Sequence, residues 1–185
     1  MKKLIRALAA AAAVMSLAGC KEEVKILEAE AGQPLATMFF DYTVNNAYTE
    51  TTLADKSTFE GYQFLIVDLS VANTTDSTIS MSDADFWISW GEGEDEYDAP
   101  ISAYGEDPLV TNELESVYEI AAGSDVRGSL VFIVPGDHDT FVLKTEDYYS
   151  TSESSEPVQG DTYSITFTIG SDGKIIMPEP EEAEE

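Results

Sequence analysis

Acidic side chains that could hold a metal ion lie close together in the middle of the chain. Asp83 and Asp85 are two residues apart, so an extended backbone would point both carboxylates to the same side. A glycine-containing acidic loop follows the next short strand, and oxygen ligands on a flexible loop suit calcium. The loop lacks the residue order of an EF-hand, and a solvated acidic loop is the alternative. The candidate calcium ligands are Asp83, Asp85, Glu92, Glu94 and Asp95.

The sequence contains no arrangement typical of an enzyme active site. His138 is the only histidine, and it lies in the segment PGDHD (135–139), which predicts an exposed turn. The Gly-x-Ser-x-Gly elbow of serine hydrolases is absent, and the pair Gly91 and Gly93 lacks the third glycine of a dinucleotide-binding loop. We therefore predict a protein without catalytic residues and, calcium apart, without a cofactor.

The N-terminal residues have the features of an export signal with a lipidation site. Basic residues at positions 2, 3 and 6 precede an uncharged apolar run, 7–17, which is well below the roughly 20 residues that span a bilayer. The run ends in LAGC (17–20), which resembles a bacterial lipobox. This resemblance implies cleavage after Gly19 and two or three acyl chains, such as palmitate, on Cys20. We expect an extracytoplasmic protein that is lipid-anchored to the cell membrane.

The charge of the chain excludes one class of partner. The sequence has 36 acidic and nine basic residues, and three of the basic residues lie in 1–19. The chain from Cys20 onward therefore has six basic residues and a formal charge of −30. Such a surface repels phosphate groups, which excludes nucleic-acid binding because that needs clustered lysine and arginine. Besides the membrane that the lipid anchor enters, the expected partners are cations, basic surfaces or neutral ligands.

The length from Cys20 onward suits one domain with its own core. Cys20 is the only cysteine, so burial and backbone pairing must hold the fold without a disulfide. We predict a signal peptide at 1–19, a tether at 20–32, a β-sandwich at 33–177 and a disordered acidic tail at 178–185. The tether could hold the domain up to roughly 40 Å from the membrane. Alternatively, Val24, Ile26 and Leu27 begin an edge strand.

Short alternating segments predict the fold class. In the segment 61–73, Leu65, Val67, Leu69 and Val71 fall on one side at a period of two, which predicts a central strand with one face in a core. The other predicted strands are 35–44, 78–81, 86–90, 101–104, 117–120, 128–135, 140–144, 163–169 and 175–177. Strands separated by turns, without intervening helices, predict an all-β, antiparallel β-sandwich. A closed barrel is the alternative.

Part of this pattern is similar to a known family. One strand and its turn read GYQFLIVDLSVANTTD (61–76), and a later strand reads GSLVFIVP (128–135), preceded by Ala122-Gly123 and followed by FVL (141–143). Over residues 33–170 the pattern resembles the telokin-like, immunoglobulin-like domains of bacterial lipoproteins, a family of unknown function. The resemblance implies an immunoglobulin-like sandwich behind a lipid anchor, and it brings no catalytic residues.

These observations predict a membrane-anchored, non-enzymatic binding or interaction module for a protein or small ligand. One alternative is an exported protease-inhibitor-like domain, which would block a protease with the predicted long loop Tyr148–Gly160. The other alternative is a calcium-binding surface protein that uses the acidic loop described above.

Overall fold

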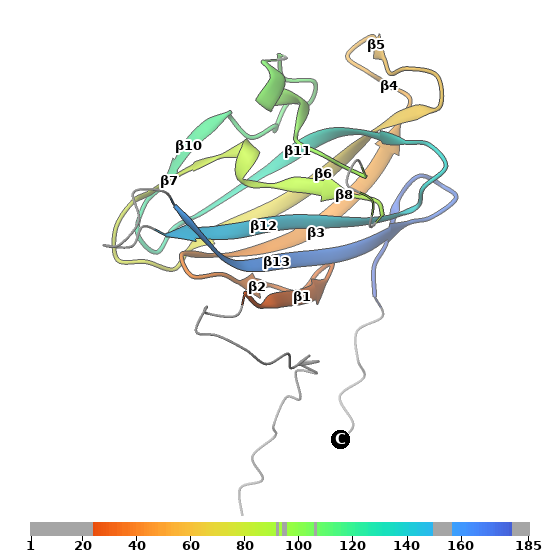
Figure 1. Ribbon diagram of the computed structural model, residues 1–185. Helices are drawn as coiled ribbons and strands as arrows, with labels where there is room; N and C mark the ends of the chain where they lie inside the picture. The colour runs from red at the N-terminus through yellow and green to blue at the C-terminus, as the bar shows by residue number, and fades with distance from the viewer. Residues whose placement is uncertain (1–23, 92, 94–95, 106, 150–156, 179–185) are drawn as a thin grey trace, which may run out of the picture.

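Two β-sheets pack face to face in the computed structural model (Figure 1), which describes residues 24–91, 93, 96–105, 107–149 and 157–178. One sheet has the order β11-β6-β3-β2. The other has the order β1-β13-β12-β8-β9, with β14 paired to β13. Neighbouring strands are antiparallel, except that β1 runs parallel to β13. The predicted antiparallel, immunoglobulin-like β-sandwich is therefore confirmed.

The strand bounds are as follows. The first sheet contains β2 (Leu35–Ala36), β3 (Phe40–Glu50), β6 (Tyr62–Asn73) and β11 (Asp125–Pro135). The second contains β1 (Ile26–Glu30), β8 (Trp87–Ser89), β9 (Tyr97–Asp98), β12 (Thr140–Tyr149), β13 (Val158–Ile169) and β14 (Ile175–Ile176). Two small pairs are β4 (Thr52–Leu53) with β5 (Lys56–Ser57), and β7 (Ile79–Ser82) with β10 (Val117–Ile120). Two 3-10 helices are η1 (Asp83–Asp85) and η2 (Ile101–Tyr104).

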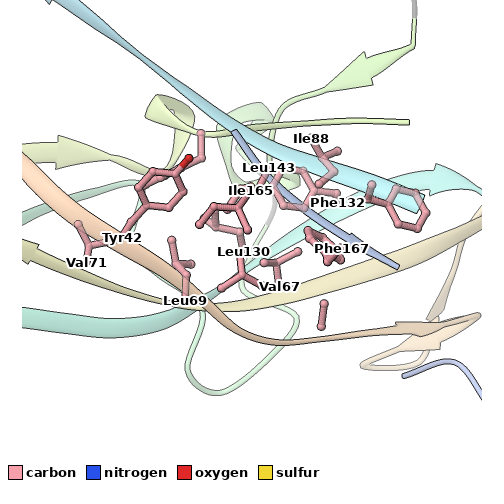
Figure 2. Packing of buried hydrophobic residues seen from close by; sticks show 14 of the residues in the cluster. Tyr42, Val67, Leu69, Val71, Ile88, Leu130, Phe132, Leu143, Ile165 and Phe167 are labelled. Carbon is pink, nitrogen blue, oxygen red and sulfur yellow. The ribbon is translucent and has the colours of Figure 1, made fainter. Parts of the chain in front are cut away.

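The core lies between the two sheets and contains the side chains that alternation placed there. Leu65, Val67, Leu69 and Val71 of β6 are fully buried, as predicted. Figure 2 shows Val67 and Leu69 in one cluster with Leu143 of β12 and Ile165 of β13. Burial of such aliphatic and aromatic side chains is the main term that stabilises a fold without disulfides.

The opposite face of β6 is also partly covered, which alternation alone did not predict. Phe64 and Ile66 are buried in a second, smaller cluster with Val131 of β11 and Ile101 of η2. The segment that contains η2 therefore lies over the outer face of the first sheet at this point. Farther along β6 the same face carries Asp68, whose carboxylate accepts two hydrogen bonds from Arg127, at 3.2 and 2.7 Å.

The predicted tether is too long, because its second half is a strand. Ile26–Glu30 forms β1 and pairs with Thr162–Thr166 of β13, so the alternative of an edge strand is the one found. Leu27 and Ala29 pack against the core, while the alternate side chains of Ile26, Glu28 and Glu30 face solvent. Only this alternation, in a short and acidic segment, distinguishes the strand from a linker.

Three further expectations are wrong. The segment 101–104 is η2 and not a strand, because it follows Pro100 and ends at Gly105, which has a φ of 81°. The predicted strand 35–44 does not end at Val44, since β3 continues through Asn45 and Asn46 with a shift of register. Both ends of the predicted loop Tyr148–Gly160 belong to strands, because β12 extends to residue 149 and β13 begins at residue 158. Residues 150–156 and 179–185, the latter in the predicted tail, lie outside the described residues.

The packing predicts a strong contrast between neighbouring positions of β6. Leu69→Ala should lower the free energy of unfolding by about 2–5 kcal/mol, because it leaves a cavity in the core between the sheets. Asp68→Asn should cost much less, since the amide oxygen can still accept a hydrogen bond from Arg127. Urea unfolding of the two variants measures both effects, and equal losses would show that the assigned faces of β6 are wrong.

Candidate functional site

A pocket lies at the end of the sandwich where β12 ends, beside β7 and the turn that precedes β3. Its volume is about 370 Å³, which is in the range of small-ligand pockets. We call it the acidic pocket, because its described lining includes three carboxylates and no lysine or arginine. The lining residues are Phe39, Phe40, Ile79, Ser80, Met81, Asp85, Thr145, Glu146, Asp147 and Tyr148.

Asp147 gives the acidic pocket a buried carboxylate. It is 4% exposed and lies where the ladder between β12 and β13 shifts register, between Glu146 and Tyr148. Its Oδ2 accepts a hydrogen bond from the hydroxyl of Tyr163 at 2.6 Å. Burial and then this bond to Asp147 raise the pKa of Tyr163, so the hydroxyl keeps its proton and remains a donor. Tyr163 therefore fixes the position of the carboxylate.

Glu146 and Tyr148 form the rim of the acidic pocket. Glu146 Oε2 accepts a hydrogen bond from the Tyr148 hydroxyl at 2.8 Å, and Oε1 accepts one from Thr162 at 3.4 Å. The bond to Glu146 is also the main reason that the pKa of Tyr148 is raised. Tyr148 is exposed, so its ring is available to a ligand.

The turn before β3 supplies the aromatic part of the wall. The Thr37 hydroxyl oxygen accepts hydrogen bonds from the backbone N–H groups of Phe39, at 3.2 Å, and Phe40, at 3.1 Å. Phe40 is buried and meets the ring of Phe86 edge-on, with 6.1 Å between ring centroids. Phe39 stays exposed. The turn therefore fixes one ring in the core and leaves the next at the pocket.

The lining favours a ligand that is both cationic and partly apolar. Carboxylates attract an ammonium or guanidinium group, and aromatic faces add a cation–π attraction. Ile79 and Met81 of β7 offer apolar contact to the carbon chain that carries the charge. An organic amine or a lysine or arginine side chain has both properties. An anionic ligand would meet only repulsion here.

Two of the predicted calcium ligands, Asp83 and Asp85, do not lie on an extended strand. Asp83 and Asp85 lie in η1, where Asp85 Oδ2 accepts a hydrogen bond from the Ser82 backbone N–H at 2.8 Å and completes a capping box. The expected extended backbone is therefore wrong. Both carboxylates still contact Ser82, whose hydroxyl donates a hydrogen bond to Asp83 Oδ1 at 3.2 Å. Although Asp85 as a whole residue is exposed, desolvation of its carboxyl group raises its pKa. The hydrogen bond from the Ser82 N–H opposes this shift, and the charge of Asp83 adds to it.

The other three candidate ligands, Glu92, Glu94 and Asp95, lie outside the described residues. Within the part of the chain that the structure describes, no three acidic, histidine or cysteine side chains form a group that could hold a metal ion. The calcium site stays a prediction. A melting temperature that rises more in calcium than in sodium chloride of equal ionic strength, and that loses this difference in Asp83→Asn, would support it.

A second group of oxygens is buried next to η1. Asp83 Oδ2, Glu113 Oε1 and the Tyr118 hydroxyl accept or donate no hydrogen bond among the described residues. Glu113 uses its other oxygen to accept the Leu109 backbone N–H at 2.7 Å. Burial first, and then the charge of Asp83, raise the pKa of Glu113, although the backbone hydrogen bonds oppose this shift. The charge of Asp83 thus disfavours the charged form of Glu113.

Glu113 is held by a short contact between its segment and β11. The Leu114 N–H donates to the Ser129 carbonyl at 2.9 Å, and the Ser129 N–H donates to the Asn112 carbonyl at 2.8 Å. Gly128 permits this approach, because a Cβ there would come within 2.5 Å of Leu114 Cδ2. A side chain at Gly128 would therefore displace the segment that carries Glu113.

His138 lies beside Asp137 in the turn between β11 and β12, where a turn was predicted. Its Nε2 is 3.8 Å from Asp137 Oδ1. Cys20, the predicted lipidation site, lies outside the described residues. No helix within the described ranges is long and apolar enough to cross a membrane.

The sequence pattern did not reveal the acidic pocket. It ended the strand at Lys144 and placed Tyr148 in a loop, so Glu146 and Asp147 were not recognised as strand residues. A signal was present, because Phe141 and Leu143 start an alternation that continues through Thr145 to Asp147, and all four are buried. No pattern in the sequence around β7 or around Phe39 indicates that these segments line the acidic pocket.

Comparisons with known proteins give a family match and a fold match. The family model described as "Domain of unknown function (DUF4352)" matches residues 29–155. Among solved structures, a candidate lipoprotein (ycdA) from Bacillus subtilis is 22% identical with a TM-score of 0.52, which shows a shared fold. The match covers 74% of this chain but only 39% of that protein.

Two other solved structures match more weakly. The yjhA protein from Bacillus subtilis is 18% identical, has a TM-score of 0.42 and is matched over 64% of this chain and 79% of its own. An uncharacterized beta-sandwich protein from Clostridium difficile is 12% identical, with a TM-score of 0.42, over 79% of this chain and 97% of its own. No curated protein matches the sequence.

The raised pKa of Glu113 predicts how a variant responds to pH. A folded-state pKa above the ordinary 4.5 means that the folded protein binds this proton more readily than the unfolded chain does. The charge of Glu113 therefore costs stability above its folded-state pKa, and this cost disappears as the pH falls towards 4.5. Glu113→Gln keeps an oxygen for the Leu109 N–H and removes the charge. It should be more stable than the unmodified protein at neutral pH and no more stable at acidic pH.

Urea unfolding at the two pH values measures this difference. The exposed neighbour Glu115 provides the control, because Glu115→Gln removes one charge without emptying a buried site. The prediction would be contradicted if Glu113→Gln did not raise the free energy of unfolding at neutral pH, or if it raised it equally at both pH values.

Proposed function

The chain belongs to the DUF4352 family, a domain of unknown function, and from this premise we propose that it is a lipid-anchored extracytoplasmic module that binds cationic ligands without catalysing a reaction. The acidic pocket carries the proposal, because it combines carboxylates with aromatic and aliphatic walls. The ligand class is an organic amine or a lysine- or arginine-bearing peptide.

Anchoring is supported by the order of features at the N-terminus. A basic segment, a short apolar run and LAGC at 17–20 follow one another, and Cys20 is the only cysteine that could take a lipid. A structural neighbour from Bacillus subtilis is itself described as a candidate lipoprotein, which agrees with this proposal. At 22% identity, the match itself shows a shared fold and nothing more.

The protease-inhibitor alternative depends on the segment 148–160. The first two and last three residues of this segment are strand residues, so the candidate blocking loop shortens to the residues between β12 and β13. The acidic pocket gives a more specific expectation about ligand chemistry, and we therefore favour the binding module.

The pocket proposal predicts an effect of Glu146 on binding of a basic peptide. A capped Lys-Leu-Lys peptide should bind the protein, and Glu146→Gln should weaken it about 1.5- to 5-fold, which corresponds to the roughly 0.2–1 kcal/mol of a partly exposed ion pair. Glu60→Gln is the control, because it removes the same charge from an exposed site outside the pocket lining. Calorimetry measures both, and equal weakening by the two variants would show general charge attraction instead of a site.

The anchoring proposal predicts the behaviour of Cys20→Ser in a bacterial host. The variant should lose all labelling by a fatty-acid analogue, because no other thiol exists in the chain. It should also remain uncleaved or leave the membrane fraction. Unchanged labelling of Cys20→Ser would end the lipoprotein proposal.

A further inference from the structure

The folded body begins close to the proposed lipid. The Lys25 backbone N–H donates a hydrogen bond to Asp161 Oδ1 at 3.0 Å, and the Lys25 carbonyl accepts one from the Thr162 N–H at 2.9 Å. Only four residues lie between Cys20 and Lys25, which are therefore joined by five Cα–Cα steps. Fully extended, they reach about 18 Å, which is less than half of the distance expected for the longer tether. A lipid on Cys20 would hold this end of the sandwich near the bilayer surface.

The same end carries exposed apolar side chains from three parts of the chain. Ile26 pairs with Thr162 of β13, which pairs in turn with Glu146 of β12, the residue that binds the Tyr148 hydroxyl. Tyr148 and Phe39 line the same pocket. The members of this anchor-side surface are Val24, Ile26, Met38, Phe39 and Tyr148, which are between 38% and 69% exposed.

We propose that the anchor-side surface rests on the lipid bilayer, with its apolar side chains in the headgroup region. The proposal rests on the lipid anchor of the proposed function and adds an orientation to it. Exposed apolar and aromatic side chains next to a lipid anchor gain free energy at the membrane interface. In water the same exposed side chains gain no such free energy, and an exposed apolar patch there promotes aggregation.

The charge near the anchor-side surface selects the kind of lipid. Glu146 and Asp161 lie among its members, and Asp85 lines the adjacent pocket. Anionic headgroups would be repelled by these carboxylates, so zwitterionic lipids are the fitting partner. The acidic pocket then opens beside the bilayer, and its cationic ligand is one that is present at the membrane surface.

Crosslinking from two phenylalanine positions tests the orientation. The chain from Cys20 onward contains every described residue, and its single thiol can be coupled to a maleimide lipid in phosphatidylcholine vesicles. A benzophenone-bearing phenylalanine analogue replaces either Phe39 or Phe59. Phe59 is the control, because it is 76% exposed and lies outside the anchor-side surface. Position 39 should crosslink to lipid about tenfold more than position 59.

Two variations sharpen the test. Replacing part of the phosphatidylcholine by phosphatidylglycerol should reduce lipid crosslinking from position 39, and so should Ile26→Asp, whose exposed position should leave the melting temperature unchanged. Equal lipid crosslinking from both positions would overturn the proposal. So would crosslinking from position 39 mainly to a second copy of the protein, which would make the surface a dimer contact.

The vesicle experiment separates this proposal from the proposed function. Coupling through the Cys20 thiol supplies the anchor chemically, so the result does not depend on lipidation in a cell. If fatty-acid labelling of Cys20 succeeds and the two crosslinking positions are equal, the orientation alone is wrong. If labelling fails and position 39 still crosslinks to lipid, the lipoprotein proposal is wrong and the membrane affinity of the surface stands.

Discussion

Burial of alternate side chains between two sheets holds this protein together, because a chain with one cysteine cannot form an internal disulfide. β6 lies at the centre of the first sheet and pairs with β3 on one side and β11 on the other. Its inner side chains meet those of β12 and β13 (Figure 2). Everything else in the molecule depends on these long strands keeping their register, since a slip of one residue would turn the core side chains to solvent.

The acidic pocket follows from where that core ends. Along β12 the inward positions run from Phe141 and Leu143 to Thr145 and Asp147, so the same alternation first buries apolar groups and then a carboxylate. Tyr163 of β13 satisfies this carboxylate with its hydroxyl. A buried acid that has a partner is tolerated, whereas one without a partner would destabilise the fold. The strands that form the core therefore also form the wall of the pocket at the end of the core.

The sequence predicted those features that depend on local alternation. The strand at 61–73, its buried face and the sandwich class follow from a period of two, and the structure confirms them. The prediction failed where a neighbour far away in the sequence decides the outcome. β1 is a strand because β13 is available to pair with it. The helix η1 is a different case, because the capping box of Ser82 and Asp85 that ends the expected extended segment is local and was overlooked in the sequence. Glu146 and Phe39 line the same pocket only in the folded protein.

We propose that the acidic pocket, and not the acidic surface as a whole, recognises cationic ligands. Backbone amide NMR shifts during titration with the capped Lys-Leu-Lys peptide test it most directly, because each described residue reports separately. Binding in the acidic pocket should give saturable shifts concentrated at Phe39, Met81 and the segment 145–148, with residues around Glu60 and Glu119 nearly unchanged. Shifts spread evenly over the exposed acids, without saturation, would contradict it.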